Sequence, residues 1–229
     1  WFGTGIDLSL TSLLWGDAVA GLINVEASGN DNSGILINAA SFEGSALALL
    51  AGVEASSNDG HGIGIGMTAF EDAAVAMTDV RAINNSDFWG DANGARIELE
   101  AGNDAFLFAG DFAAADLDDV FDYFDMLGPL GYFILQGGVN FSGNQADGLN
   151  ATLIAGRDAT VGITSAIADL NSGNGVDIQM EADGDSFALF SEVDANDNTE
   201  NGIRLALDGA GGTANAWFEY VQSTQNTGD

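Results

Sequence analysis

The stretch at residues 171–198, NSGNGVDIQMEADGDSFALFSEVDANDN, contains one period of a pattern that recurs along the whole chain. After Gly175, apolar residues alternate with polar ones at Val176, Ile178 and Met180, which is the period of a β-strand. A turn, EADGD, comes next, then an apolar run and a third short alternating segment before the next asparagine. Three short strands in about 28 residues predict one coil of a β-solenoid.

An asparagine recurs once in each expected period, at a mean spacing of about 28 residues. The members of this Asn column are Asn30, Asn58, Asn85, Asn144, Asn171, Asn198 and Asn226, with Asp116 filling the gap between Asn85 and Asn144. Stacked side-chain amides about 4.8 Å apart can hydrogen-bond to one another along the axis of a solenoid. We therefore expect the Asn column to be a structural ladder.

Three further columns keep a fixed distance from the Asn column. Five residues before it stand Val25, Val53, Val80, Asp111, Val139, Ala166, Val193 and Val221. Three residues before it stand Ala27, Ala55, Ala82, Ala113, Phe141, Ala168, Ala195 and Ser223. Four residues after it come Gly34, Gly62, Gly148, Gly175 and Gly202. Small and β-branched residues suit the inward side of a narrow coil, and the glycines indicate a positive φ or a close approach at the turn.

These columns predict an all-β fold, a right-handed parallel β-helix (β-solenoid) of about eight coils, with about 28 residues and three strands per coil. We expect residues 1–229 to form a single domain. Neither end of the sequence resembles a cap, because inward Ile6, Leu8 and Leu10 come directly after the start and the last residues lie in the turn after Asn226. The chain is therefore expected to be one unit of a longer filament or tandem-repeat chain.

Residues 113–130 allow two interpretations. Leu117, Phe121 and Phe124 are spaced as one face of an amphipathic helix, and the Gly-Pro pair at 128–129 would end it. Such a helix would be an insertion of one coil's length. Because Asp116 falls on the repeat, the same residues can instead form an irregular coil.

The charge of the chain limits its partners. Thirty-five acidic residues against four arginines and no lysine give a net charge of −31, which argues against binding to nucleic acid or anionic membranes. Self-repulsion of this size favours a saline or calcium-rich environment, so we expect an extracellular or cell-surface protein. No run of 18 apolar residues is present, so no membrane insertion is expected, and the absence of cysteine excludes disulfides.

A column of acidic residues opens the second strand of most coils: Asp17, Asp72, Asp104, Asp158 and Asp185. Each can close its turn through a hydrogen bond from its side chain to the backbone. Alternatively, Asp158 and Asp185 on adjacent coils share a calcium ion, with Asp183 and turn carbonyls completing the oxygen ligands. Ca²⁺ is the only cofactor that the sequence indicates, and the fold does not require it.

Few basic residues are available for chemistry. Arg204 and Asp177 should be outward neighbours on adjacent strands, as a surface ion pair contributing about 0–1 kcal/mol. The only histidine, His61, lies in a glycine-rich turn, and we expect no catalytic role for it. Residues 87–91, DFWGD, lengthen another turn and predict a protruding loop with two aromatics, which can bind carbohydrate, bind a neighbouring chain, or fold back over the solenoid.

The N-x-x-x-G turn followed by strand alternation, as in NSGNGVDIQM and NDNTENGIRLAL, resembles right-handed parallel β-helix proteins of the pectate-lyase-like type. The resemblance covers nearly the whole chain, and it implies a fold that enzymes, adhesins and surface fibres share. A polysaccharide lyase or hydrolase of this type would have an acidic cleft with an Arg or Lys as base or clamp. Basic residues are nearly absent here, so we expect no catalytic residues and no enzyme activity.

Regular coils and open ends favour a structural subunit of an extracellular filament or surface fibre. Its partners would be copies of itself, stacked head to tail through the open β-helix ends. The alternative is a polysaccharide-binding or polysaccharide-degrading β-helix protein, an adhesin or a lyase, with carbohydrate as the partner.

Overall fold

A computed structural model describes residues 3–13, 16–111 and 137–228. Every regular element in these ranges is a β-strand, and the alternation of apolar and polar residues predicted this. The strands are β1 (Ile6–Ser12), β2 (Ala18–Glu26), β3 (Ile35–Ser41), β4 (Ala46–Glu54), β5 (Ile63–Ala69), β6 (Ala73–Arg81), β7 (Ala95–Ala101), β8 (Ala105–Ala109), β9 (Val139–Asn140), β10 (Leu149–Ala155), β11 (Ala159–Ile167), β12 (Val176–Ala182), β13 (Ser186–Asp194), β14 (Ile203–Gly209) and β15 (Ala214–Glu219).

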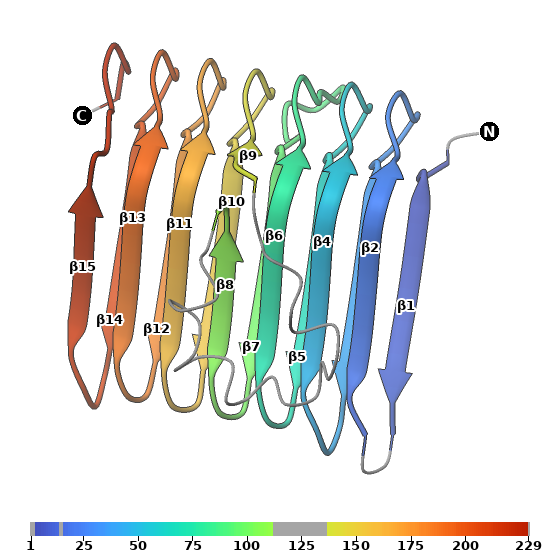
Figure 1. Cartoon of the computed structure of the whole chain (residues 1–229), viewed down its shortest axis with the longest axis vertical. Coiled ribbons are helices and arrows are strands. Elements are labelled where there is room, and N and C mark those ends of the chain that lie inside the picture. The colour runs from blue at the N-terminus through green and yellow to red at the C-terminus, as the bar shows by residue number, and fades with distance from the viewer. Residues whose placement is uncertain (1–2, 14–15, 112–136, 229) are drawn as a thin grey trace.

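The strands stack as two parallel sheets that face each other (Figure 1). The first sheet has the order β1-β3-β5-β7-β10-β12-β14, and the second has the order β15-β13-β11-β8-β6-β4-β2, with β9 pairing to β6 and β11. Each coil therefore adds one strand to each sheet, and the described residues form about seven coils with a period near 28 residues. The all-β parallel solenoid is confirmed.

One detail of the predicted coil was wrong. The second and third expected segments form one strand of nine residues, as in β13, so most coils have two strands rather than three. The strand bends at a residue with a left-handed backbone, such as Glu192 (φ 54°) or Ser165 (φ 47°), which the strand pairing skips. Because of this bend, the alternation of inward and outward residues changes face within one strand, and the sequence analysis took the residues after the bend for a separate strand.

The count of eight coils was also wrong, because the described residues between Asn85 and Asn144 form one coil, built from β7, β8 and β9, where the sequence predicted two. The side-chain Nδ2 of Asn85 donates to Oδ1 of Asn144 at 3.0 Å, although the two residues are 59 positions apart. Val80 likewise pairs directly with Val139, while Asp111, expected in that column, is exposed. The chain between β8 and β9 therefore holds an insertion of about one coil's length. The helix or coil predicted at residues 113–130 lies outside the described residues.

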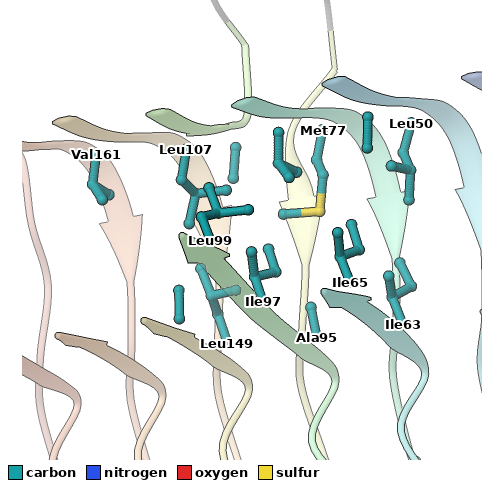
Figure 2. Packing of buried hydrophobic residues seen from close by; sticks show 14 of the residues in the cluster. Leu50, Ile63, Ile65, Met77, Ala95, Ile97, Leu99, Leu107, Leu149 and Val161 are labelled. Atoms are coloured by element: carbon teal, nitrogen blue, oxygen red, sulfur yellow. The ribbon is translucent and has the colours of Figure 1, made fainter. Parts of the chain in front are cut away.

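The core is a continuous aliphatic column between the two sheets (Figure 2). In β7, strict alternation buries Ala95, Ile97, Leu99 and Ala101 and exposes the residues between them. Ile178 in β12 is also completely buried, as predicted. The coil-opening glycines permit a close approach: a Cβ at Gly148 would lie 2.5 Å from the carbonyl oxygen of Gly175 on the next coil. Close packing, rather than a positive φ, therefore requires glycine in that column.

Candidate functional site

The Asn column forms a directional ladder along one corner of the solenoid. Asn171 donates both its backbone N–H and its Nδ2 to Oδ1 of Asn198, at 2.9 and 3.1 Å, and Asn144 donates to Asn171 in the same way. The residue before each marker has a left-handed backbone, for example Ser57 (φ 57°) and Leu170 (φ 60°), and this turns the amide into the stack. The predicted structural ladder is confirmed, and it points from the N-terminal coil to the C-terminal coil.

A second ladder runs three residues after the Asn column in most coils, and eight residues after it at Asn93, and we did not predict it from the sequence. The backbone N–H of Asn174 donates to Asp147 Oδ1 at 2.7 Å, and Asn201 donates to Asn174 Oδ1 at 3.1 Å. In the coils before these, Asp147 donates to Asn93 Oδ1 at 2.9 Å, and Asn93 donates to Nδ1 of His61 at 3.1 Å. These residues share one hydrogen-bonding task but differ in type, so their identities form no visible column.

His61 therefore has a structural role as a hydrogen-bond acceptor. Burial, and to a smaller extent the charge of Arg96, lowers its pKa below the ordinary value of 6.5, although Asp87, Asp91 and Glu98 act in the opposite direction. A neutral imidazole can accept from the Asn93 N–H, whereas an imidazolium cannot. The ladder thus depends on a histidine that stays unprotonated.

This arrangement predicts a pH dependence of stability. As the pH falls, the unfolded chain protonates His61 before the folded chain does. The contribution of neutral His61 to stability is therefore present above pH 6.5 and is lost as the pH falls toward the pKa of the folded state. Between about pH 7.5 and pH 5.5, the protein should lose stability relative to a His61→Gln variant, whose amide oxygen can still accept. Denaturant unfolding of both proteins across this range is the measurement, and parallel curves would contradict the assignment. Burial raises the pKa of Asp72, Asp169 and Asp177 in both proteins, so their effect cancels in the difference.

The acidic column binds backbone N–H groups, as the first of its two interpretations predicted, but those of the adjacent coil rather than of its own turn. Oδ1 of Asp158 accepts from the N–H of Asp185 at 2.7 Å, and Oδ1 of Asp185 accepts from the N–H of Thr213 at 2.7 Å. These bonds join adjacent coils rather than closing a local turn, and those to Thr213 lower the pKa of the Asp185 carboxyl. Within the described ranges, no three or more His, Asp or Glu side chains are grouped so that they could hold a metal ion. The calcium site predicted at Asp158, Asp185 and Asp183 therefore gains no support from geometry.

Two arginines pair with buried aspartates. Arg204 Nη1 lies 2.8 Å from Asp177 Oδ2, on adjacent strands as predicted, but the carboxylate is buried rather than on the surface. Burial raises the pKa of Asp177 and Arg204 partly offsets this, while Oδ1 of Asp177 has no hydrogen-bond partner among the described residues. Arg157 forms a two-pronged contact with buried Asp104, with Nε 2.7 Å from Oδ1. These pairs hold neighbouring coils together.

Both ends of the described solenoid are open. In β1, the inward residues Ile6, Leu8 and Leu10 are only partly buried, and in β14 the inward positions are equally half-exposed. Every residue of β15 is exposed, including Phe218 at 50%, although Phe218 continues the column of buried Phe190. The N- and C-terminal ends lie at opposite ends of the stack (Figure 1). The outer edges of the terminal strands pair with no strand in the described part of the chain.

Comparisons with known proteins show no relative of this chain. No family model, curated protein or solved structure matches it. The structure itself shows a parallel β-solenoid, which is the architectural part of the resemblance noted from the sequence. No helix in the described ranges is long and apolar enough to cross a membrane.

The loop predicted at residues 87–91 projects into solvent. Trp89 is 82% exposed and Phe88 is 91% exposed, so the alternative in which Trp89 folds back over the solenoid is wrong. Asp87, Asp91 and His61 line a hollow beside the two rings. The molecule thus offers two kinds of candidate site: the open end coils and this aromatic loop.

Proposed function

We propose that this chain is a structural unit of an extracellular filament or surface fibre that assembles head to tail. The observation that carries the proposal is that the two end coils are open. An exposed row of inward apolar side chains and unpaired strand edges is costly in water and favours pairing with another strand. The occupant with matching spacing and pattern is the opposite end of a second copy.

The apolar columns continue across such a junction. Stacking the C-terminal coil on the N-terminal coil of the next copy would place Ile203, Leu205 and Leu207 over Ile6, Leu8 and Leu10, and would place Ala214 over Ala18. Within the chain, the same columns pair Ile6 with Ile35 and Ala18 with Ala46. The junction would therefore repeat the contacts that neighbouring strands already make throughout the seven-stranded first sheet.

The ladders give the junction a polarity. In the last coil, the backbone N–H of Asn226 donates no hydrogen bond to the described residues, and in the first coil Oδ1 of Asn30 accepts none. Because each Asn donates toward the C-terminal end, Asn226 of one copy would donate to Asn30 of the next. Thr213 would likewise accept from the N–H of Asp17, as Ser45 accepts from Asp72. If two C-terminal ends met, the Asn column would face donor against donor and the Thr213 position would face acceptor against acceptor. The stack therefore grows in one direction and stays open.

The proposal extends to location and activity. A net charge of −31 makes assembly dependent on salt, which suits an extracellular or cell-surface setting, and the unit can act as a separate subunit or as part of a longer tandem chain. We propose no enzyme activity and no required cofactor. The support for this is that the ion pairs and the His61 hydrogen bond described above have a structural role, because they hold neighbouring coils together.

Assembly is predicted to depend on the apolar end faces. Ala216 in β15 continues the buried column of Ala188 but is exposed at the end of the stack, so Ala216→Glu would place a charge inside the junction without entering the core of a single copy. We expect this variant to stay monomeric in light scattering at protein and salt concentrations where the parent forms filaments visible by negative-stain microscopy. Burying the unpaired charge would weaken each junction by at least tenfold.

Ala206→Glu is the matched control, because Ala206 is an exposed, outward-facing alanine on β14 of the same coil. It adds the same charge to the same coil and should assemble like the parent. A parent protein that remains a monodisperse monomer at high protein and salt concentration would overturn the proposal.

A further inference from the structure

The exposed aromatic pair is presented by an ordered turn. Oδ1 of Asp87 accepts hydrogen bonds from the backbone N–H groups of Trp89, Gly90 and Asp91, at 3.0, 2.5 and 2.9 Å. The N–H of Asp87 donates to Oε1 of Gln145 on the next coil at 2.6 Å, and Gly90 supplies the positive φ of 87° that the turn requires. The loop is therefore tied to the solenoid at its base, and its two rings have a defined place.

The rings of Phe88 and Trp89 form a corner. Their centroids are 5.1 Å apart and their planes are at 89°, while both side chains are more than four-fifths exposed. Aromatic faces carry the negative part of the ring quadrupole and attract cations, most strongly for Trp. Two such rings at right angles provide an apolar and weakly negative corner with no protein group packed over it in the described structure.

Carboxylates line the hollow beside this corner, which has a volume of about 630 Å³. Asp31 and Asp59 occupy the same position on adjacent coils, because the N–H of Asp59 donates to the carbonyl of Asn30 at 2.8 Å. The carboxylates of Asp31, Asp59 and Asp91 make no hydrogen bond or ion pair with the described residues. His61, at the same hollow, is held neutral by burial, which lowers its pKa, so no positive side chain lines the hollow.

We propose that this hollow binds an organic cation, an alkylated ammonium group whose methyl or methylene surface packs against Phe88 and Trp89 while the carboxylates supply the opposite charge. Ring faces and unpaired carboxylates favour the same sign of ligand charge. A small inorganic cation keeps its hydration shell and gains nothing from apolar rings. A neutral sugar could stack on Trp89 but would leave the carboxylate charges uncompensated. The site lies on the turns of the solenoid, away from the end coils, so it is independent of filament assembly.

The test uses choline as the probe, on the full chain, by titration calorimetry and by quenching of tryptophan fluorescence. We expect saturable binding at one site per chain, weakened at least tenfold by Trp89→Ala and several-fold by Asp59→Asn. The neutral isostere 3,3-dimethylbutan-1-ol, which has the same shape without the charge, should bind at least tenfold more weakly than choline. Trp217→Ala is the matched control, since Trp217 is 62% exposed on β15 at the end of the stack, and it should leave choline binding unchanged.

Equal affinity for choline and its neutral isostere would overturn the proposal, because the carboxylates would then contribute nothing. Choline binding that both Trp89→Ala and Asp59→Asn leave intact would also overturn it. Binding of a neutral oligosaccharide that Trp89→Ala abolishes and Asp59→Asn leaves unchanged would replace the organic cation with a glycan. Both positions are exposed, so neither substitution is expected to disturb folding.

Discussion

Replacing Ile178 with Asp is expected to lower the free energy of unfolding by about 4 kcal/mol or more. Ile178 is fully buried in β12 and lies between Ala151 of β10 and Leu205 of β14 in the strand register. A carboxylate at this position would be surrounded by aliphatic side chains with no cation or donor within the core column. The penalty is therefore both the lost burial of the isoleucine and the cost of an unpaired charge.

The matched control is Gln179→Asp, the next residue on the same strand, which points outward and is exposed. It adds the same charge to the same coil, so it corrects for the extra repulsion in a chain that already carries −31. Chemical denaturation of both variants separates the two effects. If Ile178→Asp unfolds at the same denaturant concentration as Gln179→Asp, the inward assignment of β12 is wrong.

The repeat made much of the fold predictable from sequence. One coil cannot bury its own apolar face, so each position must satisfy the coil above and the coil below. This constraint keeps residue type constant along a column, as at Val53, Val80 and Val193, which the structure places in one buried column. Agreement between several columns therefore predicted the strand register as well as the fold class.

Arithmetic on the period failed where an insertion has the length of a coil. Asp116 lies 31 residues after Asn85 and 28 residues before Asn144, close to one period on both sides, so a count of residues cannot distinguish a coil from an inserted segment. The direct hydrogen bond between Asn85 and Asn144 decides the question. The number of strands per coil was wrong for a related reason. The alternation of apolar and polar residues changes face at the residue with the left-handed backbone, and in the sequence this change looks like the end of a strand.

The side-chain chemistry of the surface was less predictable. The second ladder uses Asn, Asp and His in turn, because any acceptor can serve the backbone N–H of the preceding coil. The outward columns of the second sheet also carry apolar side chains, since Val19, Phe187 and Trp217 are 50%, 40% and 62% exposed there. Alternation alone predicts which face a residue is on, and it does not predict how polar the outer face is.

Replacing Asn171 with Leu in the middle of the Asn column is expected to cost about 3 kcal/mol or more. Asn171 is 1% exposed, and its Oδ1 accepts both the backbone N–H and the Nδ2 of Asn144. A leucine of similar size would leave the buried N–H of Asn144 without an acceptor and would remove one of two donors from Oδ1 of Asn198. A buried donor or acceptor that is left without a partner destabilises the folded state by its full desolvation penalty, about 1–3 kcal/mol for each group.

The same substitution at the first member of the column, Asn30→Leu, is the matched control. Oδ1 of Asn30 accepts no hydrogen bond from the described residues, so this change removes one of two donors from Oδ1 of Asn58 but orphans no buried N–H. Urea unfolding of dilute protein should therefore show a cost for Asn30→Leu less than half that for Asn171→Leu. Equal costs would mean that the amides act by packing rather than by the directional ladder. If the ladder continues between copies, Asn30→Leu should also weaken filament growth at concentrations where the parent assembles, because Asn226 of the preceding copy would then have no acceptor.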